Sequence, residues 1–203
     1  MDNSYLFYDI ETTGLNKAFD QVLEFAAIRT DQRLNELERH TISVNLRPDV
    51  VPSPRAILTN RIFVSDPARG MREYEAAAQI HQLMNQPGTI SLGYNTLGFD
   101  DEVLRFSFHR NLLPPYTHQF KNGCRRMDLF PMAVLYWLYK RDVITWPEID
   151  GKPSLKLENI GSANQMATGR AHEAMADVAT TVELARRFYQ KGKMWHYLEG
   201  YFD

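Results

Sequence analysis

Two acidic residues occupy alternate positions of an apolar segment near the start of the chain. Asp9 and Glu11 lie in the run Phe-Tyr-Asp-Ile-Glu at 7–11. Because successive side chains of a β-strand point to opposite faces, a strand here directs both carboxylates to the same face. Burying such acids without a partner costs several kcal/mol, whereas their oxygens are the ligands that hard divalent cations prefer. The pair therefore predicts a divalent-cation site on the first strand.

Three further residues of related chemistry stand much later in the chain. Asp100 ends the run Gly-Tyr-Asn-Thr-Leu-Gly-Phe-Asp, and His172 and Asp177 bound the run His-Glu-Ala-Met-Ala-Asp. A histidine pKa is ordinarily near 6.5, which suits proton transfer from water, and flanking carboxylates should raise it. Five positions separate His172 from Asp177, so the two would diverge by roughly 140° on one helix. We therefore expect His172 at or before the start of the helix that carries Asp177.

Several of these residues also have a purely structural interpretation. Asp100 and Asp101 could be acids favoured by the dipole at a helix start, an interpretation that is stronger for Asp101. Glu24 is expected to form a salt bridge rather than to bind metal. The remaining histidines are expected to be structural or surface residues: His40, His81, His109, His118 and His196.

Together the five residues resemble the DEDD superfamily of 3′–5′ exonucleases, in its histidine-containing branch. That superfamily has Asp-x-Glu-Thr on its first strand, a second Asp after Asn-x-x-x-Phe, and His-x-x-x-x-Asp on a late helix. All three pieces stand here in that order. The resemblance implies a ribonuclease-H-like fold, which is an α/β fold with a mixed β-sheet flanked by helices.

The resemblance also implies a metal-dependent hydrolysis of phosphodiester bonds. Two Mg²⁺ ions, for which Mn²⁺ can substitute, would lie ~3.5–4 Å apart, one activating water and the other holding the leaving 3′ oxygen. Asp9 would bridge both ions, Glu11 and Asp177 would bind one, and Asp100 would hold the second directly or through water. His172 would be the general base.

Within the superfamily, the chain most resembles the exonuclease I family of bacterial single-strand-specific DNA exonucleases. The similar stretches extend over nearly the whole chain: 25–31, 92–95, 99–103, 146–148, 151–154 and 171–178. Members of that family continue into C-terminal domains that embrace the single strand, whereas this sequence ends soon after its last predicted helix. We therefore predict a single exonuclease domain over 1–203 and leave processivity open.

A basic, aromatic segment suggests the substrate. No acid stands between Leu104 and Met127, while five cations do: Arg105, Arg110, Lys121, Arg125 and Arg126. Cations that follow a phosphate chain, interleaved with aromatics that stack on bases, are typical of single-strand binding. The alternative is that Phe106 and Phe108 pack in the core and the cations are solvated. The resemblance assigns strand contacts to Arg105, Tyr116 and Phe120.

The resemblance also places Lys156 near the scissile end of the strand, where an arginine is usual in the family. Thr12, Thr13 and Gly14 directly follow the acidic strand, and their small side chains would let backbone N–H groups approach the terminal nucleotide. A tight turn at Gly14 is compatible with this role.

Composition and periodicity set the wider frame. The 203 residues are 44% hydrophobic and carry a formal net charge of −2, which is ordinary for a globular domain and gives no global nucleic-acid signature. The single cysteine, Cys124, suits a reducing compartment, and no apolar run approaches the ~20 residues that span a bilayer. A cytoplasmic protein without a membrane partner is expected.

The pattern of apolar residues predicts an α/β protein. The expected strands are Tyr5–Glu11, Val22–Thr30, Thr41–Leu46 and Thr89–Tyr94. The expected helices are Glu73–Met84, Asp100–His109, Leu129–Tyr139, which should be buried, and Glu173–Tyr189. Ser154 is expected to cap a helix or turn that starts near Leu155.

The function favoured is release of mononucleotides from the 3′ end of single-stranded DNA. One alternative is an exoribonuclease or oligonucleotide-trimming enzyme, since the same five residues serve both sugars. Another is a non-catalytic nucleic-acid-binding module of a repair complex. The partners suggested are single-stranded DNA or RNA, together with a single-strand-binding protein or another repair protein.

Overall fold

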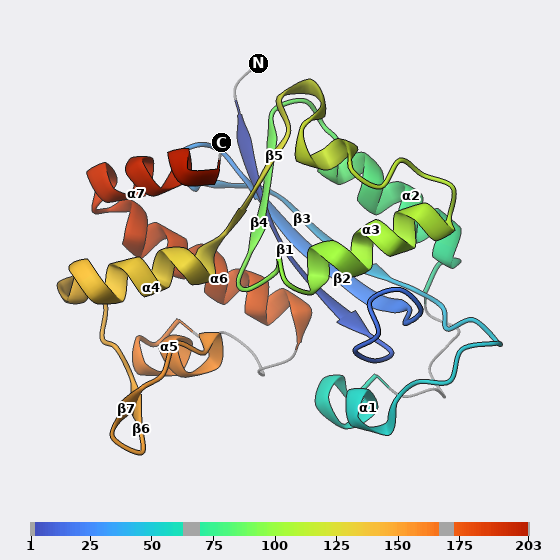
Figure 1. Cartoon of the computed structure of the whole chain (residues 1–203), viewed down its shortest axis with the longest axis horizontal. Helices are drawn as coiled ribbons and strands as arrows, with labels where there is room; N and C mark the ends of the chain where they lie inside the picture. Colours follow the sequence, from blue (N-terminus) through green and yellow to red (C-terminus); the bar gives the residue numbers. More distant parts are fainter. Residues whose placement is uncertain (1–2, 63–69, 167–172, 203) are drawn as a thin grey trace.

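The fold is built around a five-stranded mixed sheet, with strand order β3-β2-β1-β4-β5 (Figure 1). The computed structural model describes residues 3–62, 70–166 and 173–202. The strands are β1 (Ser4–Thr12), β2 (Val22–Thr30), β3 (Glu36–Ser43), β4 (Thr89–Gly93) and β5 (Arg125–Asp128). The first three strands form an antiparallel meander, and β4 and β5 run parallel to β1. The mixed sheet flanked by helices confirms the predicted fold class.

Helices pack against both faces of the sheet (Figure 1). One core contains side chains of α2 (Glu73–Met84) and α3 (Asp100–Arg110) against the even-numbered β1 residues Leu6, Tyr8 and Ile10. The other core contains side chains of α4 (Leu129–Tyr139), α6 (Ala174–Tyr189) and α7 (Gly192–Glu199), together with Tyr5 and Phe7 of β1. The alternation of a strand then places Asp9 and Glu11 on the second face, which α6 covers.

Shorter elements complete the described chain. They are the helices α1 (Pro54–Asn60) and α5 (Leu157–Ala163) and a small hairpin of β6 (Glu148–Ile149) and β7 (Lys152–Pro153). Single helical turns of the 3₁₀ type lie at Thr117–Gln119, Lys121–Gly123, Arg141–Val143 and Gly200–Phe202. No helix in the described ranges is long and apolar enough to cross a membrane.

Most predicted elements are confirmed, and the exceptions have physical causes. The third strand is Glu36–Ser43 rather than Thr41–Leu46, because this edge strand exposes a largely charged surface and lacks apolar alternation. Ser154 does not cap a helix: α5 begins at Leu157, and the Ser154 hydroxyl accepts a hydrogen bond from Asn159 Nδ2 at 2.8 Å. The predicted helix at 129–139 is correct in its bounds, but it is not fully buried, because Leu138 and Tyr139 at its end are exposed.

Candidate active site

The acidic residues predicted to bind metal come from three elements that meet at one end of β1. Asp9 and Glu11 lie in the last part of β1, Asp100 is the first residue of α3, and Asp177 lies in the first turn of α6. In Figure 1 the starts of α3 and α6 both lie near the arrowhead of β1. The structure therefore places all four predicted acids at one end of the sheet.

Burial and mutual repulsion raise the pKa of these carboxyl groups. The pKa of Asp9 is raised well above its usual value by burial and then by the charges of Asp100, Asp177 and Glu11. The pKa of Glu11 is raised to about 8 by burial and then by Asp177, Glu24 and Asp100. These shifts show that the groups share one electrostatic environment.

Asp100 is also buried among acids, and backbone hydrogen bonds restrain its carboxylate. Burial raises its pKa to about 7, while hydrogen bonds from the backbone amides of Asp100 and Ile10 oppose that rise. Ile10 lies between the two acids of β1, so this bond ties the Asp100 carboxylate to the acidic strand. Asp100 is therefore more than an acid placed at a helix start by the dipole.

The donor atoms suit a hard divalent cation. All four acids offer carboxylate oxygens, and a cation between them would reverse the rise in their pKa. Within the described ranges, however, no three histidine, cysteine, aspartate or glutamate side chains stand close enough together to hold a metal ion. To share one ion, these side chains would have to stand closer together than they do in this structure. His172 lies outside the described residues, and α6 begins after it, at Ala174, as the spacing to Asp177 requires.

The turn that follows β1 is tightly bonded around Asp20. The Asp20 carboxylate accepts hydrogen bonds from Thr13 Oγ1 at 2.8 Å and from Asn16 N at 2.7 Å. Thr12 Oγ1 donates to Gly14 O at 2.7 Å. A Cβ atom on Gly14 would lie 2.6 Å from Asp20 Oδ2, so a larger residue would displace the Asp20 carboxylate from these hydrogen bonds. Thr13 is fully buried, and its N–H donates to Gln21 O at 2.9 Å, so it fixes the turn from inside. Thr12, at the end of β1, and Gly14 line the pocket beside Glu11.

Arg110 donates hydrogen bonds to the backbone of this turn, although the sequence analysis placed it in the strand-binding segment. Its guanidinium donates to Ala18 O at 2.9 Å and to Asp20 O at 3.4 Å. It also forms an ion pair of 2.7 Å with Glu73, which is 9% exposed and also pairs with Arg47. Arg110 is therefore bonded within the fold, and it matches neither the strand-binding interpretation of the segment nor the alternative of a solvated cation.

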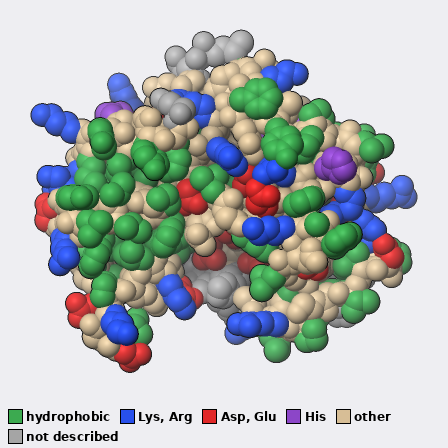
Figure 2. All heavy atoms as spheres, in the orientation of Figure 1, with side chains coloured by type: hydrophobic (Ala, Val, Ile, Leu, Met, Phe, Trp, Pro, Cys, Tyr) green, Lys and Arg blue, Asp and Glu red, His purple; other side chains and the backbone are tan. Residues whose placement is uncertain are grey.

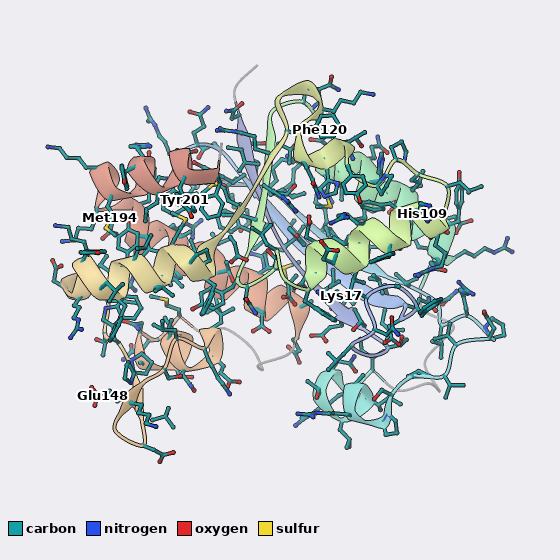
Figure 3. The ribbon with its side chains drawn as sticks, viewed as in Figure 1. Lys17, His109, Phe120, Glu148, Met194 and Tyr201 are labelled. Atoms are coloured by element: carbon teal, nitrogen blue, oxygen red, sulfur yellow. The ribbon has the colours of Figure 1, made fainter. Side chains whose placement is uncertain are left out.

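The other predicted strand contacts remain on the surface to different degrees. The Arg105 guanidinium bonds to Glu102 and stacks over the Tyr116 ring at 4.2 Å, leaving Tyr116 about half exposed (47%). Phe120 is 68% exposed and lies at the opposite end of the sheet from the acids (Figure 3). Contact with Phe120 would thus need a strand several nucleotides long.

Asp101 is buried, together with His118 and Phe108 of the basic segment. Asp101 is 1% exposed and binds Arg126 Nη1 at 2.7 Å and His118 Nε2 at 3.1 Å. Phe108 is fully buried, as the alternative interpretation of that segment expected, whereas Phe106 is 41% exposed. The segment is therefore partly core and partly surface.

Asp128 is a residue that sequence reasoning missed. Its Oδ1 accepts hydrogen bonds from the backbone amides of Asn95 and Phe130 at 2.8 and 2.9 Å, and its Oδ2 accepts one from Leu97 at 3.1 Å. It therefore caps α4 and also fixes the turn that precedes Asp100. An aspartate directly before an apolar helical run is a recognisable N-cap signal, but only the fold shows the second role.

Two pockets flank the acids. A pocket of about 190 Å³ beside Glu11 lies between the turn after β1 and α1. A larger pocket of about 590 Å³ contains Lys156, Phe130 and Asp177, so Lys156 does lie beside the acidic site. Figure 2 shows a hollow between α5 and α1 with acidic side chains inside it. Glu11 and Asp177 thus each line a pocket on this hollowed face.

Comparisons with known proteins find similar sequences and a similar fold. Residues 6–185 match the RNase_T family model, described as exonuclease. The chain is 36% identical to exodeoxyribonuclease I of Haemophilus influenzae over 94% of its length and 38% identical to that of Escherichia coli K12 over 91%. The solved structure of E. coli exonuclease I with a dT13 oligonucleotide superposes with a TM-score of 0.93 at 36% identity, covering 96% of this chain and 43% of that one. The chain spans 41% and 39% of the lengths of the two curated relatives.

Proposed function

Because this chain belongs to the RNase_T exonuclease family, we propose that it hydrolyses single-stranded DNA from the 3′ end and releases mononucleotides. The observation that carries this proposal is the group of carboxylates at the end of β1. Burial and neighbouring acids raise the pKa values of Asp9, Glu11 and Asp100, an arrangement that is costly unless a cation neutralises it. A protein without metal chemistry would gain nothing from this cost.

Each residue has a role in the proposed reaction. Asp9, Glu11, Asp100 and Asp177 would hold two divalent cations, Mg²⁺ with Mn²⁺ as a substitute, which when bound activate water and stabilise the leaving oxygen. His172 would accept the proton of the attacking water.

The surfaces beside the acids would hold the substrate. Thr12 and Gly14 would contact the terminal nucleotide, and the buried Thr13 would hold the turn that positions them. Lys156, in the larger pocket beside Asp177, would attract a backbone phosphate. The described geometry supports these assignments by position.

Single-stranded DNA is the substrate best supported. Solved structures similar to this chain contain E. coli exonuclease I with dA16 and dT13 oligonucleotides. RNA is the second candidate, because the same catalytic acids serve both sugars. We further propose that the 203 residues act as one exonuclease domain in the cytoplasm, where a buried free thiol such as Cys124 stays reduced, and that they meet single-strand-binding or repair proteins there.

The proposal is tested with labelled DNA and RNA single strands incubated with the chain in Mg²⁺ or in EDTA. We expect the parent to release mononucleotides from DNA in Mg²⁺ and none in EDTA. The Asp9→Ala variant should release none in either condition. Turnover of that variant at the parent rate would remove the assigned metal site. RNA degraded faster than DNA would reverse the substrate assignment.

A further inference from the structure

The short helix α1 is hydrogen-bonded to the end of β1, the strand that carries Asp9 and Glu11. Figure 1 shows α1 set apart from the sheet, beyond the end of β1. Two hydrogen bonds hold it there: Ser53 N donates to Thr13 O at 2.8 Å, and Asn60 Nδ2 donates to Thr12 O at 3.1 Å. Because the bonds come from both ends of the helix, the position of α1 relative to β1 is well defined.

The pocket between α1 and the turn after β1 suits part of one nucleotide. Its volume is about 190 Å³, which is below the ~300 Å³ at which pockets for drug-sized ligands begin. Leu15 and Phe99 supply apolar surface, and Thr12 and Gly14 supply backbone. Glu11, a proposed metal ligand, also lines this pocket.

Arg55, on α1, brings a positive charge to this pocket. Glu11 and Arg55 are its charged lining residues. Arg55 is exposed and has no hydrogen-bond or ion-pair partner within the described part of the chain. By contrast, Arg105 and Arg110 each pair with an acid. The Arg55 guanidinium is thus available to an anionic ligand.

We propose that Arg55 binds the phosphate of the terminal nucleotide and retains the released 5′-mononucleotide; this inference rests on the proposed function. In hydrolysis the oxygen of water bonds to phosphorus, the bond to the upstream 3′ oxygen breaks, and that oxygen takes up a proton. The phosphate changes from a diester with one charge to a monoester whose second pKa is about 6. At pH 7.5 the product is therefore more negative than the substrate, and Arg55 attracts it more strongly.

The test measures equilibrium binding of dTMP and of thymidine, which lacks the phosphate, by calorimetry in Mg²⁺. The variant is Arg55→Gln, and the matched control is Arg61→Gln, which removes an exposed charge just after the same helix and away from the pocket lining. We expect Arg55→Gln to weaken dTMP binding five- to tenfold and to leave thymidine binding unchanged. The difference should shrink as salt rises. Arg61→Gln should bind dTMP within twofold of the parent.

Other outcomes overturn the inference in distinguishable ways. Equal loss of dTMP and thymidine binding would mean that Arg55 contacts the base or sugar, and the phosphate assignment would be wrong. If Arg55→Gln binds dTMP like Arg61→Gln, Arg55 has no role in binding. Hydrolysis of linear single-stranded DNA by the parent, measured alongside, shows whether the proposed function stands when this inference fails. A parent that binds no dTMP removes the nucleotide pocket altogether.

Discussion

Glu11→Gln should stabilise the metal-free chain, and the gain should depend on pH. The Glu11 pKa is about 8 in the folded chain against 4.5 as its ordinary value. The folded state therefore binds the proton more tightly than the unfolded state. The stability contributed by this group is complete below pH 4.5 and is lost as the pH rises towards 8. Glutamine does not titrate, so the variant escapes this loss.

The size of the change in unfolding free energy follows from the shift of the Glu11 pKa. Each pKa unit corresponds to about 1.4 kcal/mol, so the shift amounts to about 5 kcal/mol in full and to about 3 kcal/mol at pH 7. Neighbouring acids titrate over the same range and share part of this energy. We therefore expect the free energy of unfolding of the variant, minus that of the parent, to be about 2–3 kcal/mol larger at pH 8.5 than at pH 4.5.

Urea unfolding in EDTA at pH 4.5, 7 and 8.5 measures this gain. The control is Glu148→Gln, an exposed glutamate on β6 (Figure 3), which should show no comparable change with pH. With Mg²⁺ the order should reverse, because the parent gains stability from ion binding and the variant has lost a ligand. A variant less stable than its parent in EDTA at pH 8.5, or a gain equal at all three pH values, would refute the electrostatic account.

The remaining predictions concern the basic segment and the turn after β1. Arg105→Ala should flatten the slope of log affinity against log salt for a long single strand by roughly 0.7, while Tyr116→Ala and Phe120→Ala should raise the Michaelis constant without changing that slope. A dinucleotide should respond to none of the three, and unchanged binding of the long strand would make the segment ordinary surface. Arg110→Ala should lower the free energy of unfolding by about 1.5–3 kcal/mol, because Glu73 loses a buried charged partner; a loss below about 0.5 kcal/mol in urea titrations would contradict this.

Periodicity predicted the long elements because their apolar residues repeat over many positions. β2, α2 and α4 have the predicted bounds. The helix α1 was missed, because its seven residues are too few to show a period, although Pro54 at its start is a typical first helical residue. The alternation of Asp9 and Glu11 correctly predicted that both acids share one face.

Pairing between distant residues could not be predicted in the same way. A segment free of acids, from 104 to 127, suggested exposed cations, but Arg110 meets Glu73 of α2 and Arg126 meets Asp101 of α3. The second role of Asp128, which holds the turn before Asp100, depends on β5 lying beside β4. Residue types and spacing identify candidates for chemistry, whereas the neighbours of each charge depend on how the strands and helices pack.

The polarity of digestion tests the central claim most directly. A single strand labelled at its 5′ end should shorten stepwise from a free 3′ hydroxyl in Mg²⁺, leaving progressively shorter labelled products and released mononucleotides. The same strand with a blocked 3′ end, and a circular single strand, should remain intact. Cleavage of the circle at a rate similar to that of the linear strand, or shortening that begins at the 5′ end, would contradict a 3′–5′ exonuclease.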